Sequence, residues 1–207
     1  MKNLTEIVFI IDKSGSMFGL EKDTIGGFNS TIQKQLKEDG IAYVSTILFN
    51  GSTEVLHDRV ELDKIMPLTL NDYQPAGSTA LYDALGGAIN HIRKVHRDGR
   101  KEDLPEKTIF IITTDGMENA SHRYSRKMVK ELISHQQEKH NWEFIFLGAN
   151  IDSGDTAESI GIKRNRARNY VNDCRGVKEN YACMSEAISY VRQSISLDDD
   201  TWKKVDR

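Results

Sequence analysis

Oxygen-bearing side chains follow or precede the apolar runs of this sequence at three separate places. An Asp-x-Ser-x-Ser stretch, a Gly-Ser-Thr triplet and a Thr-Thr-Asp-Gly stretch supply Asp12, Ser14, Ser16, Thr79 and Asp115. None of the five is His or Cys, which disfavours zinc and copper and favours a hard cation such as Mg²⁺, with Mn²⁺ or Ca²⁺ as alternatives. The group therefore predicts a divalent-metal site made of hydroxyl and carboxylate oxygens.

The mixture of hydroxyls and carboxylates suggests a division of roles. Direct ligation by Ser14, Ser16 and Thr79 would leave most of the charge on the ion, because hydroxyls are neutral. Asp12 and Asp115 would then lie one layer out and accept hydrogen bonds from bound water and from the hydroxyls. An ion held in this way stays electrophilic, so we expect it to accept one more oxygen, ideally a carboxylate of another molecule.

These residues act together only if the fold brings their segments to one place. Four apolar runs have the β-branched and aromatic character of strands buried on both faces. The runs are 6–11, 43–49, 108–114 and 142–147. Asn50-Gly51 after the second run predicts a hairpin into a short antiparallel edge strand, 53–56.

Between these runs the apolar residues recur at helical spacing. The stripes lie within 25–36, 81–95, 128–132 and 177–195. The last stripe spans fewer than three heptads, which favours a helix packed on the sheet over a partner-binding coiled coil. The alternation predicts an α/β fold, doubly wound, with a mostly parallel sheet, one antiparallel edge strand and helices on both faces. Ligands of such sheets bind beyond the carboxyl ends of the strands, where the five oxygen-bearing residues fall.

The spacing of these residues resembles the metal-ion-dependent adhesion site of the von Willebrand factor A (integrin I-like) family, in its stand-alone cytoplasmic prokaryotic type. The resemblance extends over roughly residues 4–194, and Asp12, Ser14, Ser16, Thr79 and Asp115 all match. It implies a Rossmann-like fold, metal contacts from the two serines and the threonine, and aspartates that act largely through water. It also implies metal-dependent binding of a protein partner that offers an Asp or Glu carboxylate.

The resemblance further implies a possible switch. When the partner's carboxylate arrives, Thr79 moves into direct coordination, and the loop around Asp115 and the last helix shift. A purely structural interpretation remains open: the serines cap their loop, Thr79 caps its helix and Asp115 ends a strand. That interpretation leaves unexplained why all three loops bring oxygen ligands to one edge.

Two other functions are alternatives to a binding module. One is a regulatory or scaffold subunit of an ATPase or chaperone-like complex, in which the metal is structural. The other is a metal-assisted hydrolase with Asp12 as nucleophile, which is disfavoured because position 14 is Ser and no Gly-x-x-x-x-Gly-Lys-Ser/Thr or Gly-x-Ser-x-Gly motif occurs. We therefore expect a protein that is not an enzyme and has no catalytic residues.

Other polar residues near the same edge are weaker candidates. Asp152 and Asp155 are expected to cap the next helix, and the basic run 163–168 is interpreted as a solvated loop, with an anion contact as the alternative. Four residues that follow the metal loops are expected to line the partner-facing surface. They are Tyr82, Met117, Glu118 and Asn119.

Composition limits the class of protein. The chain has 207 residues and a net charge of -3, which suits one domain and gives no reason to expect a nucleic acid as ligand. We place that domain at 1–195 and a flexible tail at 196–207. No run is long enough to span a membrane and no signal peptide is evident, so we expect a cytoplasmic protein. Cys174 and Cys183 are expected to be reduced thiols.

Overall fold

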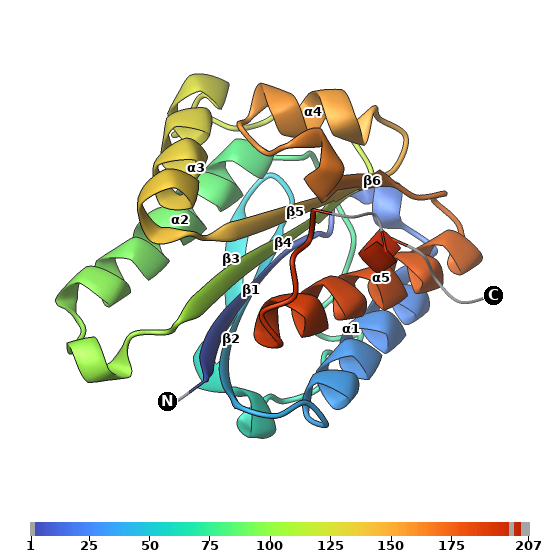
Figure 1. Cartoon of the computed structure of the whole chain (residues 1–207). Coiled ribbons are helices and arrows are strands. Elements are labelled where there is room, and N and C mark those ends of the chain that lie inside the picture. Colours follow the sequence, from blue (N-terminus) through green and yellow to red (C-terminus); the bar gives the residue numbers. More distant parts are fainter. Residues whose placement is uncertain (1–2, 199–200, 204–207) are drawn as a thin grey trace.

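Six strands form a single sheet in the order β3-β2-β1-β4-β5-β6 (Figure 1). The computed structural model describes residues 3–198 and 201–203. The strands are β1 Leu4–Asp12, β2 Ile41–Phe49, β3 Thr53–Glu61, β4 Lys107–Thr114, β5 Glu143–Gly148 and β6 Ala167–Asn169. β3 pairs antiparallel with β2 at the edge, and the other neighbouring strands pair parallel. The predicted fold class is confirmed.

The central strand β1 separates two hydrophobic cores. All nine of its residues are buried, because side chains alternate between the two faces of a sheet that helices cover on both sides. Ile7, Phe9 and Ile11 face one core, whereas Val8 and Ile10 face the other. This position places the carboxyl end of β1 in the middle of the sheet edge.

In the described part of the chain, five α-helices cover the two faces of the sheet. The helices are α1 Glu21–Gln35, α2 Leu81–Asp98, α3 Arg126–His140, α4 Ser153–Ser159 and α5 Cys174–Arg192. α1 and α5 lie side by side over one core, and α2, α3 and α4 cover the other (Figure 1). Short 3-10 turns occupy Gly15–Met17, Leu62–Lys64, Lys101–Asp103, Arg164–Arg166 and Thr201–Lys203. Within the described ranges, no helix is long and apolar enough to cross a membrane.

The edge strand β3 is longer than the predicted 53–56. It continues to Glu61 through a register irregularity opposite Val44 and Thr46, and Arg59 has a positive φ of 50° there. Most of its side chains are exposed or half-buried. An edge strand of this kind carries few apolar residues, so its length leaves little trace in the sequence.

The prediction of a solvated loop at 163–168 is wrong for Arg166. Its side chain is buried, forms ion pairs with Glu143 at 3.0 Å and Asp198 at 3.1 Å, and donates to the carbonyl of Leu197. The run continues directly into β6. The anionic partners of Arg166 are therefore carboxylates of the same chain, and not a bound ligand.

The chain beyond residue 195 contributes to the core. Leu197 and Trp202 are 2% and 0% exposed, and both belong to the cluster under α1 and α5. Packing therefore extends past the expected domain boundary. Positions 199–200 and 204–207 lie outside the described residues, so a flexible tail there stays a prediction.

Candidate metal centre

Three loops meet beyond the carboxyl ends of β1 and β4. Asp12 is the last residue of β1, and Asp115 directly follows β4. The loop that carries Thr79 packs against the first loop, because Gly15 N donates to Gly77 O at 3.0 Å. The same loop is tied to the end of β2, where Asn50 O accepts from Ala80 N at 2.7 Å. The structure thus brings together the three segments that the sequence singled out.

Four of the five predicted residues form one chain of hydrogen bonds. Asp12 Oδ1 accepts from the backbone N–H of Ser14 at 2.7 Å, and the Oγ atoms of Ser14 and Ser16 lie 3.1 Å apart. Ser16 Oγ donates to Asp115 Oδ1 at 2.5 Å. The serine hydroxyls therefore lie between the two carboxylates.

Thr79 faces the same space from the third loop. A Cβ atom placed on Gly116 would lie 3.8 Å from both Ser16 Oγ and Thr79 Oγ1. The backbone of Thr79 is fixed from both sides by Asn119, whose Oδ1 accepts from Thr79 N at 2.9 Å and whose N–H donates to Thr79 O at 3.0 Å. The threonine hydroxyl is thus presented by a backbone held in place.

Asp12 has further partners that sequence reasoning missed, one at its carboxylate and one at its backbone carbonyl. Thr114, the last residue of β4, donates its hydroxyl to Asp12 Oδ2 at 2.7 Å. Tyr73 is fully buried and donates its hydroxyl to the backbone carbonyl of Asp12 at 2.6 Å. Thr114 was recognisable in the Thr-Thr-Asp-Gly stretch. Tyr73 was not, because it lies in the irregular segment after β3.

Two asparagines fix Asp115. Asn172 Nδ2 donates to Asp115 Oδ2 at 3.0 Å, and Asn150 Nδ2 donates to the Asp115 carbonyl at 3.2 Å. Asn150 follows β5 at the same sheet edge, a position from which it was predictable. Asn172 lies two residues before α5. Asp115 therefore connects the centre to the start of the last helix.

The centre contains two buried carboxylates. Asp12 and Asp115 are 0% and 1% exposed, and among residues 3–198 and 201–203 no Lys, Arg or His forms an ion pair with either. The neighbouring Lys13 pairs with Glu54 instead. Burial raises the pKa of Asp12, the hydrogen bonds from Ser14 and Thr114 lower it in part, and the charge of Asp115 raises it further. Buried charge of one sign is costly unless a counter-charge joins it.

The donor set fits a hard divalent cation. Two carboxylates and three hydroxyls offer only oxygen, the ligand atom that Mg²⁺, Mn²⁺ and Ca²⁺ prefer. In the part of the chain that the structure describes, no three His, Cys, Asp or Glu side chains gather as a metal-binding group. A cation in this centre would therefore depend on the hydroxyls.

The interpretation of the hydroxyls as simple caps is contradicted. Ser14 precedes the 3-10 turn at Gly15–Met17 and makes no side-chain cap bond there. The N-cap of α2 is Ala80, not Thr79, and it too lacks a side-chain cap bond. Capping thus does not account for Ser14 and Thr79.

Three of the weaker candidates, Asp152, Asp155 and Glu118, form hydrogen bonds or ion pairs within the chain. Asp152 caps α4 as predicted, accepting from Asp155 N at 2.9 Å, whereas Asp155 pairs with Arg164 rather than capping. Glu118 accepts from the backbone N–H groups of Tyr82 and Ser121 at 2.9 and 2.7 Å. Glu118 therefore fixes the loop that follows Asp115, a role that the sequence did not reveal.

Sequence comparison finds a relative that matches part of the chain. No protein-family model matches the chain. Inter-alpha-trypsin inhibitor heavy chain H3 from Bos taurus is 28% identical over an alignment of 134 residues, and the match covers 59% of this chain and 14% of that protein. The chain thus spans a small part of the length of the curated relative that it matches.

Comparison with solved structures defines the class of fold. A von Willebrand factor type A protein from Catenulispora acidiphila matches 87% of this chain and 41% of its own, with a TM-score of 0.58 and 14% identity. Proximal thread matrix protein 1 from the mussel byssus, with a zinc-occupied MIDAS motif, matches 93% and 47% with a TM-score of 0.59 and 14% identity. Manganese-loaded TRAP protein from Plasmodium vivax matches 86% and 72% with a TM-score of 0.57 and 18% identity. The chain has the fold of von Willebrand factor A domains.

Proposed function

We propose that this chain is a metal-dependent protein-binding module of the von Willebrand factor A family. Ser14, Ser16 and Thr79 hold a divalent ion directly, and Asp12 and Asp115 hold it through water and through the hydroxyls. The observation that carries the proposal is the pair of buried carboxylates, joined by serine hydroxyls and without an ion-pair partner in the described residues. A divalent ion there balances the buried negative charge.

The protein's own residues prepare the centre for a partner. A bound ion supplies a Lewis-acidic position at which a partner's Asp or Glu oxygen completes the coordination shell. Asp115 holds the Ser16 hydroxyl, Asp12 holds the Ser14 backbone, and Asn119 holds the Thr79 backbone. The ligand atoms are thus positioned before metal or partner arrives, which reduces the ordering that binding requires.

Two exposed apolar side chains flank the centre. Phe18 follows Ser16 by two positions and is 79% exposed, and Met117 follows Asp115 by two positions and is 75% exposed. Large apolar side chains with polar neighbours are typical of binding surfaces. We propose that the partner presents a carboxylate with apolar side chains beside it.

A route for the proposed conformational response is present. Asp115 Oδ2 accepts from Asn172, and Asp173 next to it caps α5 by accepting from Gly176 N at 2.7 Å. A change in the position of Asp115 is therefore passed to the first turn of α5. Saturation with metal and an acidic ligand should shift the backbone NMR signals of that turn.

Among the described residues, the enzyme alternative lacks a supporting contact in the centre. The amine of Lys13 is engaged by Glu54, so it does not assist a nucleophilic Asp12. The scaffold alternative differs in one respect: a structural metal would need no coordination position open to a partner's carboxylate. We therefore propose a binding protein and not an enzyme; a cytoplasmic location stays a prediction.

Crystals grown with Mn²⁺ and acetate test the proposal. We expect anomalous density for the ion between Ser14, Ser16 and Thr79, with an acetate oxygen in its shell as a stand-in for the partner's carboxylate. An ion without acetate would support the structural-metal alternative. Absence of an ion from this centre would overturn the proposal. The zinc-occupied motif of the mussel protein is a reason to repeat the soak with Zn²⁺.

A further inference from the structure

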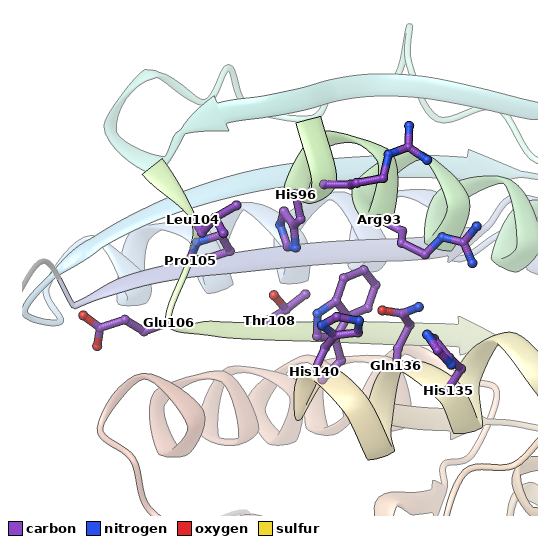
Figure 2. A pocket seen from close by; sticks show the side chains of 11 residues that line it. Arg93, His96, Leu104, Pro105, Glu106, Thr108, His135, Gln136 and His140 are labelled. Atoms are coloured by element: carbon purple, nitrogen blue, oxygen red, sulfur yellow. The ribbon is translucent and has the colours of Figure 1, made fainter. Parts of the chain in front are cut away.

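A cavity lies at the end of the sheet opposite to the metal centre. It has a volume of about 450 Å³ and opens between the last turns of α2 and α3, over the start of β4. Figure 2 shows His96 and Arg93 on α2 on one side, Gln136, His135 and His140 on α3 on the other, and Thr108 between them. This size is within the range of small-molecule sites.

The wall of the cavity contains a buried amide whose hydrogen-bonding groups are unsatisfied. Gln136 is 0% exposed, and neither its Nε2 nor its Oε1 has a hydrogen-bond partner in the described residues. Its backbone carbonyl accepts from Trp142 N at 3.2 Å, which anchors the residue beside the indole. A buried amide without partners is costly, so such a group indicates a ligand or ordered water.

The same cavity has a flat apolar wall. Trp142 is 5% exposed, and its ring stacks on Phe110 with centroids 5.3 Å apart and an interplanar angle of 17°. Leu104 and Pro105 are half-buried and continue the lining. The indole thus contributes a rigid apolar contact to the lining, of the kind that packs against a planar group.

The mouth of the cavity is cationic. Arg93 and Arg97 project from α2, and both are exposed. Arg97 is ion-paired with Asp98 at 2.8 Å, whereas Arg93 forms no ion pair among the described residues, so Arg93 is the guanidinium open to a ligand. The rings of His135 and His140 lie across from them, with centroids 5.8 Å apart. Glu106 is the acidic residue of the lining. Guanidinium groups at a cavity mouth favour a carboxylate or phosphate over a neutral ligand.

We propose that this cavity binds a small organic anion whose flat ring carries a hydrogen-bond donor beside an acceptor. The ring lies against Trp142, its polar edge pairs with the Gln136 amide, and the anionic group lies against Arg93. Adenosine monophosphate combines these features, because a Gln amide pairs with the edge of adenine through one donor and one acceptor. This site is independent of the metal centre.

The test is an NMR titration of the full chain, ¹⁵N-labelled at tryptophan, with adenosine monophosphate in EDTA. EDTA keeps the phosphate from binding through a metal. The chain contains two tryptophans, and a Trp202→Phe variant assigns the indole signal of Trp142. We expect that signal to shift saturably below about 1 mM nucleotide. Adenosine alone and inorganic phosphate alone should each bind at least about tenfold more weakly, since each lacks half of the recognised features.

Variants locate the binding. Gln136→Leu keeps the side-chain size and removes the unpaired amide, and Arg93→Gln removes one guanidinium from the surface; each should weaken binding about tenfold. Lys94→Gln makes the same change of charge at the next position of α2, outside the cavity lining, and should leave binding unchanged. No saturable shift, equal binding of phosphate alone, or equal loss in the Lys94 variant would each overturn the proposal, and ordered water would then account for the amide.

Discussion

The hydroxyl of Ser16 lies 2.5 Å from Asp115 Oδ1, although 99 positions separate the two residues in the chain. The bond joins the loop after β1 to the loop after β4, at the point where neighbouring parallel strands end. It places a neutral hydroxyl against a buried carboxylate. A cation held there keeps most of its charge, which is the property that the proposed capture of a partner's carboxylate needs.

Thr79→Ala should remove a metal ligand with little effect on the metal-free fold. The recorded hydrogen bonds of Thr79 run through its backbone to Asn119, and the variant retains them. We expect Mn²⁺ affinity in calorimetric titration to fall at least about tenfold. The melting temperature in EDTA should change by less than about 2 °C, the effect of roughly 0.5 kcal/mol in a domain of this size. Ser30→Ala, an exposed change on α1, is the control and should alter neither quantity.

Asp12→Asn should stabilise the metal-free protein at neutral pH. Burial raises the pKa of Asp12 above 3.8 in the folded state, so the native state binds a proton more tightly than the unfolded state does. Stability of the metal-free wild type therefore falls as pH rises from 3.8 through the raised native pKa. The amide is neutral throughout, and Thr114 can accept from it instead of donating.

Denaturant unfolding in EDTA as a function of pH measures this difference. The Asn variant should be the more stable protein at pH 7, and the two curves should converge as the wild-type carboxyl group becomes protonated. A wild type that is more stable than the variant at pH 7 in EDTA would show that the fold tolerates the buried charge without a cation. Added Mg²⁺ should stabilise only the wild type.

Thr114→Val should weaken the centre from its second layer. The hydroxyl donates to the buried Asp12 carboxylate at 2.7 Å, and hydrogen bonds to charged groups contribute about 1.5–3 kcal/mol. Substitution of a residue that hydrogen-bonds to a metal-binding side chain typically lowers metal affinity about 10–100-fold. Denaturant unfolding and Mn²⁺ titration measure the two effects. Thr113→Val on the same strand is the matched control, and equal effects of the two substitutions would rule out a special role for Thr114.

Trp202→Ala should destabilise the protein by about 3–5 kcal/mol, the usual cost of removing a buried aromatic side chain. Trp202 is 0% exposed and packs with the core under α1 and α5. Ser196→Ala, in the exposed part of the same segment, should cost less than about 0.5 kcal/mol. A Trp202 variant as stable as the wild type would return this segment to the flexible tail that the sequence suggested.

The elements that sequence predicted best are those whose burial determines their composition. β1 and β4 each contain a continuous apolar run because both faces of the sheet are covered there, and the ends of these runs located Asp12 and Asp115. β6 has only three residues, Ala-Arg-Asn, and pairs on one side with β5, so it leaves no apolar run. Its neighbour Arg166 is buried because acceptors from distant segments surround it, and local composition does not encode such contacts.

The same distinction applies to the candidate site: residues with a local sequence signal were predicted, and those placed by tertiary packing were not. The five oxygen-bearing residues follow strand ends or precede a helix, where local sequence and topology agree. Tyr73 and Asn172 bind Asp12 and Asp115 from irregular segments, whose path depends on tertiary packing. On α3 the apolar stripe was placed one position early: Met128 is 44% exposed, whereas Val129 and Ile133 are buried. With few apolar residues on that helix, the pattern did not fix which face is buried.

Thermal unfolding in EDTA and in excess Mg²⁺ tests the central claim most directly. The wild type is compared with the double variant Ser14→Ala/Ser16→Ala, which keeps both carboxylates. Metal at a hundred times its dissociation constant adds about 2.7 kcal/mol of stability, or roughly 5–10 °C in melting temperature for a domain of this size. The account predicts that shift for the wild type and little or none for the double variant. An equal shift in both proteins, or no shift of the wild type with millimolar Mg²⁺, Mn²⁺, Ca²⁺ or Zn²⁺, would contradict a metal centre built on these hydroxyls.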